Sequence, residues 1–132
     1  MRNIVPVLIF SLIFLAGCSE NKPFVVFSSD PITSSSSGKF EKIFKPEQRI
    51  YYAVAVPKGF KDNVIRIQIV KKDEKSEFWG YKQLRSQDYR IQNAHYFIDY
   101  ITLSQKGYYF FRAYERNNLT KPLVQDEFWI RE

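Results

Sequence analysis

The sequence predicts an all-β protein, folded as an antiparallel sandwich or barrel of about seven to nine short strands. Aromatic residues make up 17% of the 132 residues, and aromatic and β-branched side chains suit the half-buried surface of a sheet. Several segments alternate apolar and polar positions, which is the pattern of a strand. No segment repeats apolar residues at helical spacing over three turns, so we expect no long helix in the folded domain.

The first candidate strand covers residues 24–27, a compact apolar run with the sequence FVVF. The stretch that follows, residues 28–38 (SSDPITSSSSG), has the composition of a flexible loop or linker. The apolar run is either an edge strand of the domain or part of a tether. We favour the edge strand, because exposed large apolar residues in a tether would be a liability.

The clearest alternation occurs in residues 49–56 and 63–70, which a Pro-Lys-Gly turn separates. In both segments every second residue is isoleucine, valine or tyrosine. These residues are predicted to face the core: Ile50, Tyr52, Val54 and Val56 in the first segment, and Ile65, Ile67 and Ile69 in the second.

The middle of the chain has weaker patterns. Residues 77–82 carry three aromatic side chains, and residues 89–91 are a short candidate strand. Residues 96–104 predict a long strand, but Asp99 interrupts its pattern and leaves the inward face undecided.

Two predicted strands joined by a polar turn complete the chain. Residues 108–114 place Tyr109, Phe111 and Ala113 on one face, and residues 123–130 form the last strand.

The sequence from Leu103 to Tyr109 resembles the E–F corner of immunoglobulin-like and fibronectin type III-like domains. In such corners a tyrosine near the start of strand F hydrogen-bonds to the backbone a few residues upstream. The resemblance implies this role for Tyr109, with Gly107 in the turn, and an immunoglobulin-like antiparallel β-sandwich. The chain lacks the intersheet disulfide of many such domains, although Trp79 could serve as their packing aromatic residue. The alternative is an ordinary hairpin with a glycine turn.

The N-terminus has the three-part build of a secretory signal peptide. Arg2 supplies a positive start, and an apolar run follows from residue 4 to residue 14. This run is shorter than the about 20 residues that a membrane-spanning helix needs. An uncleaved anchor and an ordinary secretory signal are the alternatives.

The apolar run ends in a motif that resembles the lipobox of bacterial lipoproteins: Leu15, Ala16, Gly17 and Cys18. Cys18 is the only cysteine of the chain. The resemblance implies cleavage before Cys18 and acyl chains, such as palmitate, on that residue. Two or three acyl chains suffice for stable anchoring, so we predict a protein attached to a membrane of the cell envelope. Ser19, where enteric bacteria place aspartate as an inner-membrane signal, favours the outer membrane of a diderm cell.

The predicted domain organisation has three parts. Residues 1–17 are the signal peptide, residues 18–38 hold the lipidated cysteine, a possible edge strand and a serine-rich linker, and residues 39–132 form the β-sandwich domain. Because the signal peptide carries one arginine and no acid, cleavage lowers the formal net charge from +6 to +5.

Residue patterns for catalysis are nearly missing from the sequence. His95 is the only histidine, and the sequence contains no Gly-rich phosphate loop, no nucleophile elbow and no zinc-ligand spacing. We therefore expect no enzyme, no cofactor and no metal site. A hydrolase that uses carboxylates is a less favoured alternative, with Asp99, Glu115 and Asp126 as its candidates.

The outward face of residues 108–114 carries aromatic and arginine side chains: Tyr108, Phe110, Arg112 and Tyr114. Such residues are enriched at protein interfaces, although a loop or the 24–27 segment could cover them. We predict a non-catalytic binding or interaction module for an envelope protein or glycan. The alternative is a structural accessory lipoprotein that adds a strand at a sheet edge, along residues 24–27 or 123–130. Nucleic acid is not expected as a partner, because a lipoprotein lies outside the cytoplasm.

Overall fold

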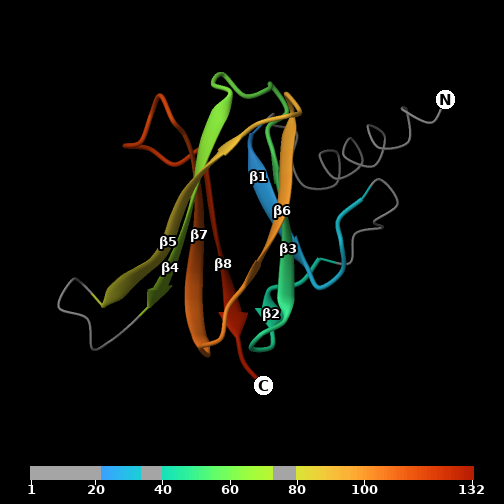
Figure 1. The fold of residues 1–132 in the computed structure, drawn as a ribbon, viewed down its shortest axis with the longest axis vertical. Helices are drawn as coiled ribbons and strands as arrows, with labels where there is room; N and C mark the ends of the chain where they lie inside the picture. Colours follow the sequence, from blue (N-terminus) through green and yellow to red (C-terminus); the bar gives the residue numbers. More distant parts are fainter. Residues whose placement is uncertain (1–21, 34–39, 73–79) are drawn as a thin grey trace.

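The computed structural model describes residues 22–33, 40–72 and 80–132. In these ranges the chain is all-β and contains eight strands and no helix. The strands form two sheets that pack face to face as a sandwich (Figure 1). The all-β prediction is therefore confirmed at the level of two packed sheets.

The smaller sheet has three antiparallel strands in the order β1-β3-β6. They are β1 (Phe24–Ser28), β3 (Arg49–Ala55) and β6 (Tyr96–Thr102). The central position of β3 matches its sequence, because six of its seven residues are apolar or aromatic.

β1 belongs to the folded domain. It pairs with β3 along its whole length, from Phe24 opposite Ala55 to Ser28 opposite Tyr51. The side chain of Phe27 is buried in the core. The sandwich thus begins well before residue 39.

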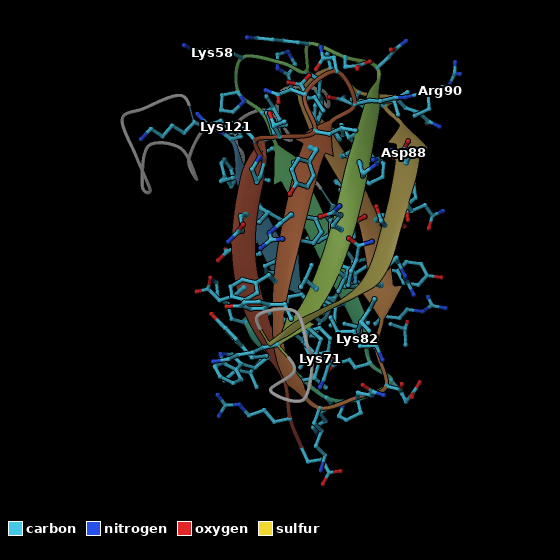
Figure 2. The ribbon with its side chains drawn as sticks, turned by 90° about the vertical axis from the view of Figure 1, so that its left-hand side faces the viewer. Lys58, Lys71, Lys82, Asp88, Arg90 and Lys121 are labelled. Carbon is cyan, nitrogen blue, oxygen red and sulfur yellow. The ribbon has the colours of Figure 1, made fainter. Side chains whose placement is uncertain are left out.

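The larger sheet has five strands in the order β2-β8-β7-β4-β5, and Figure 2 looks onto its outer face. The strands are β2 (Ile43–Phe44), β4 (Val64–Lys72), β5 (Tyr81–Arg90), β7 (Gly107–Glu115) and β8 (Val124–Ile130). β2 runs parallel to β8, and the other neighbours are antiparallel.

The strand β5 differs from the prediction, which named only residues 89–91 as a short candidate strand in this part of the chain. It is one continuous edge strand, and residues 81–88 are all exposed to solvent. Because the facing sheet has only three strands, it does not cover this edge of the larger sheet. A strand that is exposed on both faces needs no alternation, so the sequence carries no period-two signal there.

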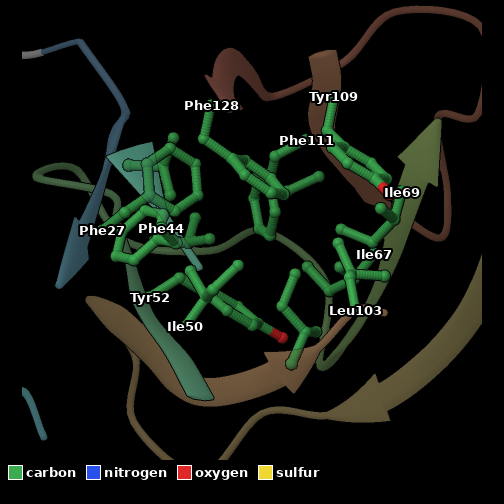
Figure 3. Packing of buried hydrophobic residues seen from close by; sticks show 14 of the residues in the cluster. Phe27, Phe44, Ile50, Tyr52, Ile67, Ile69, Leu103, Tyr109, Phe111 and Phe128 are labelled. Carbon is green, nitrogen blue, oxygen red and sulfur yellow. The ribbon is translucent and has the colours of Figure 1, made fainter. Parts of the chain in front are cut away.

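The core between the sheets is rich in aromatic rings (Figure 3). Tyr52 lies 4.7 Å from Phe111 between ring centroids, and the rings of Tyr109 and Phe128 stack at 5.3 Å. The predicted inward faces of residues 49–56, 63–70 and 108–114 are confirmed by the burial of these residues: Ile50, Tyr52, Val54, Val56, Ile65, Ile67, Ile69, Tyr109, Phe111 and Ala113. Full burial of one such side chain stabilises the fold by about 1.5–3 kcal/mol.

A tyrosine hydrogen bond holds the connection between β6 and β7. The Tyr109 hydroxyl donates to the carbonyl oxygen of Gln105 over 2.5 Å. Gly107 has a φ of 155°, and a Cβ at this position would lie 2.8 Å from the Cε atom of Lys71. The Lys71 side chain could move away from such a Cβ, so it is the φ of Gly107 that favours glycine in this turn. The hydrogen bond fixes the position of the turn relative to the core.

Candidate functional site

The structure places most of the predicted interaction face on the outer surface of the larger sheet. Tyr108, Phe110 and Arg112 alternate with buried residues of β7 and are partly exposed. Tyr114 has the same outward parity but is only 9% exposed. It lies on the central strand β7, where Arg66 of β4 is its cross-strand neighbour, and this crowded position explains its burial. The prediction of an exposed Tyr114 is therefore wrong.

Four rings form a continuous row across the larger sheet, which we name the aromatic stripe: Tyr81, Phe110, Tyr108 and Trp129. Neighbouring ring centroids lie 5.6 Å, 5.0 Å and 4.3 Å apart along this row. The two ends of the stripe are the most open, with Tyr81 40% and Trp129 39% exposed. Between β5 and β7, the buried Val70 pairs with Phe110 and supports the row from β4.

Arginine side chains lie next to the stripe. The guanidinium carbon of Arg131 is 5.0 Å from the centroid of the Trp129 ring, and that of Arg112 is 6.0 Å from the Phe110 ring. Arg112 Nε also donates to Gln125 Oε1 over 2.9 Å, which fixes the side chain against the sheet. Desolvation raises the pKa of the Tyr108 hydroxyl, and the carboxylate of Glu127 raises it further. The stripe thus combines apolar surface with cation–π contacts.

Sequence reasoning missed both ends of the stripe. Trp129 could have been found from the alternation of the last strand, where it lies between the buried Phe128 and Ile130. Tyr81 could not, because its strand shows no alternation and its ring meets Phe110 only through the order of strands in the sheet.

The candidate carboxylates of a hydrolase lie in separate surroundings. Asp99 borders a hollow of about 380 Å³ beside Tyr89 and Phe97. Glu115 accepts hydrogen bonds from backbone N–H groups of the β3–β4 loop. Asp126 forms an ion pair with Lys42 on the surface. These contacts hold the three carboxylates apart, so they do not form one acid–base pair.

Metal ligands do not gather in the described part of the chain. No group of three or more His, Cys, Asp or Glu side chains in residues 22–33, 40–72 and 80–132 could hold a metal ion. His95 lies exposed in the β5–β6 loop, where its backbone N–H donates to Asn93 Oδ1.

Several predicted residues lie outside the described ranges, among them the lipobox residues Leu15, Ala16, Gly17 and Cys18 and the aromatic Trp79. Among the described residues, no helix is long and apolar enough to cross a membrane.

No protein-family model matches the chain, and the curated proteins contain no significant match. Among solved structures, the chain is similar to two variants of superoxide reductase (neelaredoxin) from Ignicoccus hospitalis. The first is 11% identical with a TM-score of 0.43, and the match covers 89% of this chain and 84% of the other. The second is 13% identical with a TM-score of 0.39, and the match covers 89% and 85% of the two chains.

These matches correct the functional prediction from the sequence. Both matched structures are of an enzyme by their titles, which contradicts the expectation of a non-catalytic binding or interaction module and the expectation that the chain is not an enzyme. Both expectations are withdrawn, together with the accessory and hydrolase alternatives. At these TM-scores, the likeness assigns no activity to this chain.

Proposed function

We propose that this chain is a lipoprotein of the bacterial cell envelope, held at a membrane by acyl chains on Cys18. The lipobox-like motif and the single cysteine of the chain support this attachment. Ser19 favours the outer membrane if the cell has two membranes.

The folded part is proposed to be an immunoglobulin-like sandwich. The hydrogen bond from Tyr109 to Gln105, four residues upstream, supports this assignment because it has the form of a tyrosine corner. The packing of a three-stranded sheet on a five-stranded sheet is compatible with it.

The start of β1, which follows the proposed anchor in the sequence, and the aromatic stripe lie at opposite ends of the sandwich. Only residues 19–23 separate Cys18 from β1, and five extended residues reach about 18 Å at most. Phe24 starts at the end of the sheet that carries Ala55. Tyr108 lies next to Gly107, at the end where the short β6–β7 connection turns (Figure 1). An anchored domain therefore turns its stripe away from its point of attachment.

The stripe is proposed to contact another protein of the envelope. The observation that carries this proposal is the row of partly exposed rings with arginines beside it. The ring planes are inclined to one another by 36° to 69°. A partner can therefore contact both the edges and the faces of the aromatic rings. Such a surface fits protein side chains better than the flat face of a sugar chain, and anchored partners meet at a raised effective concentration.

The anchor is tested by growing cells that produce the wild-type chain or the Cys18→Ala variant with labelled palmitate. We expect label on the wild-type protein only, because the variant lacks the sulfur that accepts the lipid. Equal labelling of both proteins would contradict the lipoprotein assignment.

The stripe is tested by a photo-crosslinking residue at position 129, at the open end of the row. Position 100 is the matched control, because Tyr100 is a similarly exposed aromatic residue (43%) on the opposite sheet. We expect protein adducts from intact cells at position 129 and few at position 100. Adducts to glycan alone, or equal yields at both positions, would contradict a protein partner at the stripe.

A further inference from the structure

Basic side chains gather on the loops at the end of the sandwich where β1 begins. The β3–β4, β5–β6 and β7–β8 connections meet there, and Figure 2 shows Lys58, Arg90 and Lys121 at this end. Five exposed cations make up this surface, which we name the basic end: Lys58, Lys61, Arg90, Arg116 and Lys121.

The acids at this end are already engaged. Asp88 forms an ion pair with Arg66 over 2.7 Å, and this contact lowers the pKa of Asp88. The Glu115 carboxylate accepts from the backbone N–H groups of Lys61 and Asp62 over 2.6 Å and 2.8 Å.

The Asp62 carboxylate caps the backbone of its own loop, where it accepts from Asn63 and Val64. Within the described ranges none of the five cations of the basic end forms an ion pair. After Arg66, Arg116 also lowers the pKa of Asp88, so this acid offsets part of the charge of Arg116. The other four cations of the basic end are exposed to solvent.

Backbone hydrogen bonds tie the loops of the basic end into one surface. Val56 N–H donates to the carbonyl of His95 and Phe60 N–H to that of Ala94, over 2.7 Å and 2.8 Å. Arg116 N–H donates to the carbonyl of Val64 over 3.1 Å. These bonds hold the backbone of the β3–β4 loop against the β5–β6 loop and tie Arg116, at the start of the β7–β8 connection, to the first residue of β4.

We propose that the basic end rests on anionic phospholipid headgroups and forms a second, electrostatic attachment beside the lipid anchor. The proposal builds on the proposed lipoprotein function, because the short segment 19–23 leads from Cys18 to this same end. Each lysine or arginine close to an anionic membrane raises binding by about fivefold. A polybasic surface is one of the signals that can add to acyl chains in membrane attachment.

The test uses the mature chain, residues 18–132, with Cys18→Ser, so that no acyl chain contributes. Binding to vesicles of phosphatidylcholine with phosphatidylglycerol is compared with binding to phosphatidylcholine alone by sedimentation. We expect a clear preference for the anionic vesicles that is lost at high salt, where the Debye length falls to about 3 Å.

The variant K58Q/R90Q/K121Q removes three charges from the basic end, and K45Q/K72Q/K82Q removes three exposed charges near the opposite end. We expect the first to weaken binding to anionic vesicles by roughly 100-fold, and the second by less than about threefold. Equal losses in both variants would overturn the proposal, as would equal binding to both kinds of vesicle.

Two further arms separate the headgroup from other anions. Competition by inorganic phosphate beyond that of chloride at equal ionic strength would indicate a site for free phosphate and overturn the proposal. Binding only to vesicles that contain lipopolysaccharide would assign the surface to an acidic glycan and overturn it too. Because the Cys18→Ser chain carries no lipid, these results are independent of the palmitate test.

Discussion

The two ends of the sandwich differ in what they expose to solvent. At the basic end, cations from two loops and from the last residue of β5 are exposed, while Asp88 pairs with Arg66 and Glu115 binds the loop backbone. At the opposite end, by contrast, lysines pair with acids, as Lys42 does with Asp126 and Lys106 with Glu132. Lys45, Lys72 and Lys82 are also exposed near this end, and the rings of the aromatic stripe lie beside them on the larger sheet.

This difference shows how one small domain can carry two separate surfaces. Strands of seven to nine residues, such as β3 and β4, span the distance between the ends, so the basic end and the aromatic stripe stay apart. β1 begins at the basic end, so the proposed anchor leads into that end and the stripe lies at the other.

The largest expected loss of stability comes from removing a buried ring of the core, which lies between the two ends of the sandwich. Phe111 is fully buried between Phe27 and Tyr52, with ring centroids at 5.5 Å and 4.7 Å. Phe111→Ala should lower the free energy of unfolding by about 3–5 kcal/mol, measured by urea denaturation. The control is Phe110→Ala, which removes the neighbouring ring from the outer face and should cost well under half as much. Equal losses would contradict the assignment of the two faces of β7.

A substitution at Glu115 should lower the stability of the basic end alone, with a smaller effect on the free energy of unfolding. Glu115→Gln removes the charge that holds the backbone of Lys61 and Asp62, and hydrogen bonds to a charged group contribute about 1.5–3 kcal/mol. Because the glutamine amide oxygen can still accept from these N–H groups, we expect a loss below this range by denaturation, with faster amide hydrogen exchange in residues 57–63. The partly exposed Glu127 provides a control, because Glu127→Gln should change neither quantity. Unaltered exchange in the β3–β4 loop of the Glu115 variant would show that the carboxylate does not hold it.

The smallest loss of stability is expected from a substitution at the opposite end, in the turn between β6 and β7. Tyr109→Phe removes the hydrogen bond to Gln105 and should cost about 0.5–1.5 kcal/mol, with faster exchange near residues 105–107. Tyr52→Phe is the matched control, because the buried Tyr52 hydroxyl has no hydrogen-bond partner in the described ranges and burial raises its pKa well above the usual value. Its removal should leave the free energy of unfolding unchanged or slightly higher. A greater loss from Tyr52→Phe than from Tyr109→Phe would contradict these assignments.

Much of the sheet structure was predictable from the chain alone, wherever a strand has one buried face. The isoleucines of β4 and the alternating residues of β3 and β7 were assigned correctly because a half-buried strand must place apolar residues at every second position. For the same reason Tyr108, Phe110 and Arg112 were placed on the outer face. β5 was not predicted because most of its residues are exposed on both faces. The burial of Tyr114 was not predicted because alternation indicates which way a side chain points, but not how closely neighbouring strands pack around it.

By itself, the amino-acid sequence determined the local features of this protein: which segments alternate, which turn needs glycine, and where a lone cysteine follows an apolar run. Only the tertiary structure decided which distant residues share a surface. The rings of Tyr81 and Trp129 belong to one stripe because of the order of strands in the sheet. The cations at residues 58, 90 and 121 lie at one end of the sandwich because the segments that carry them end on the same side. The alternation of apolar residues indicates which positions of one segment are buried. A shared surface depends on contacts between distant segments, and a local sequence pattern does not predict these.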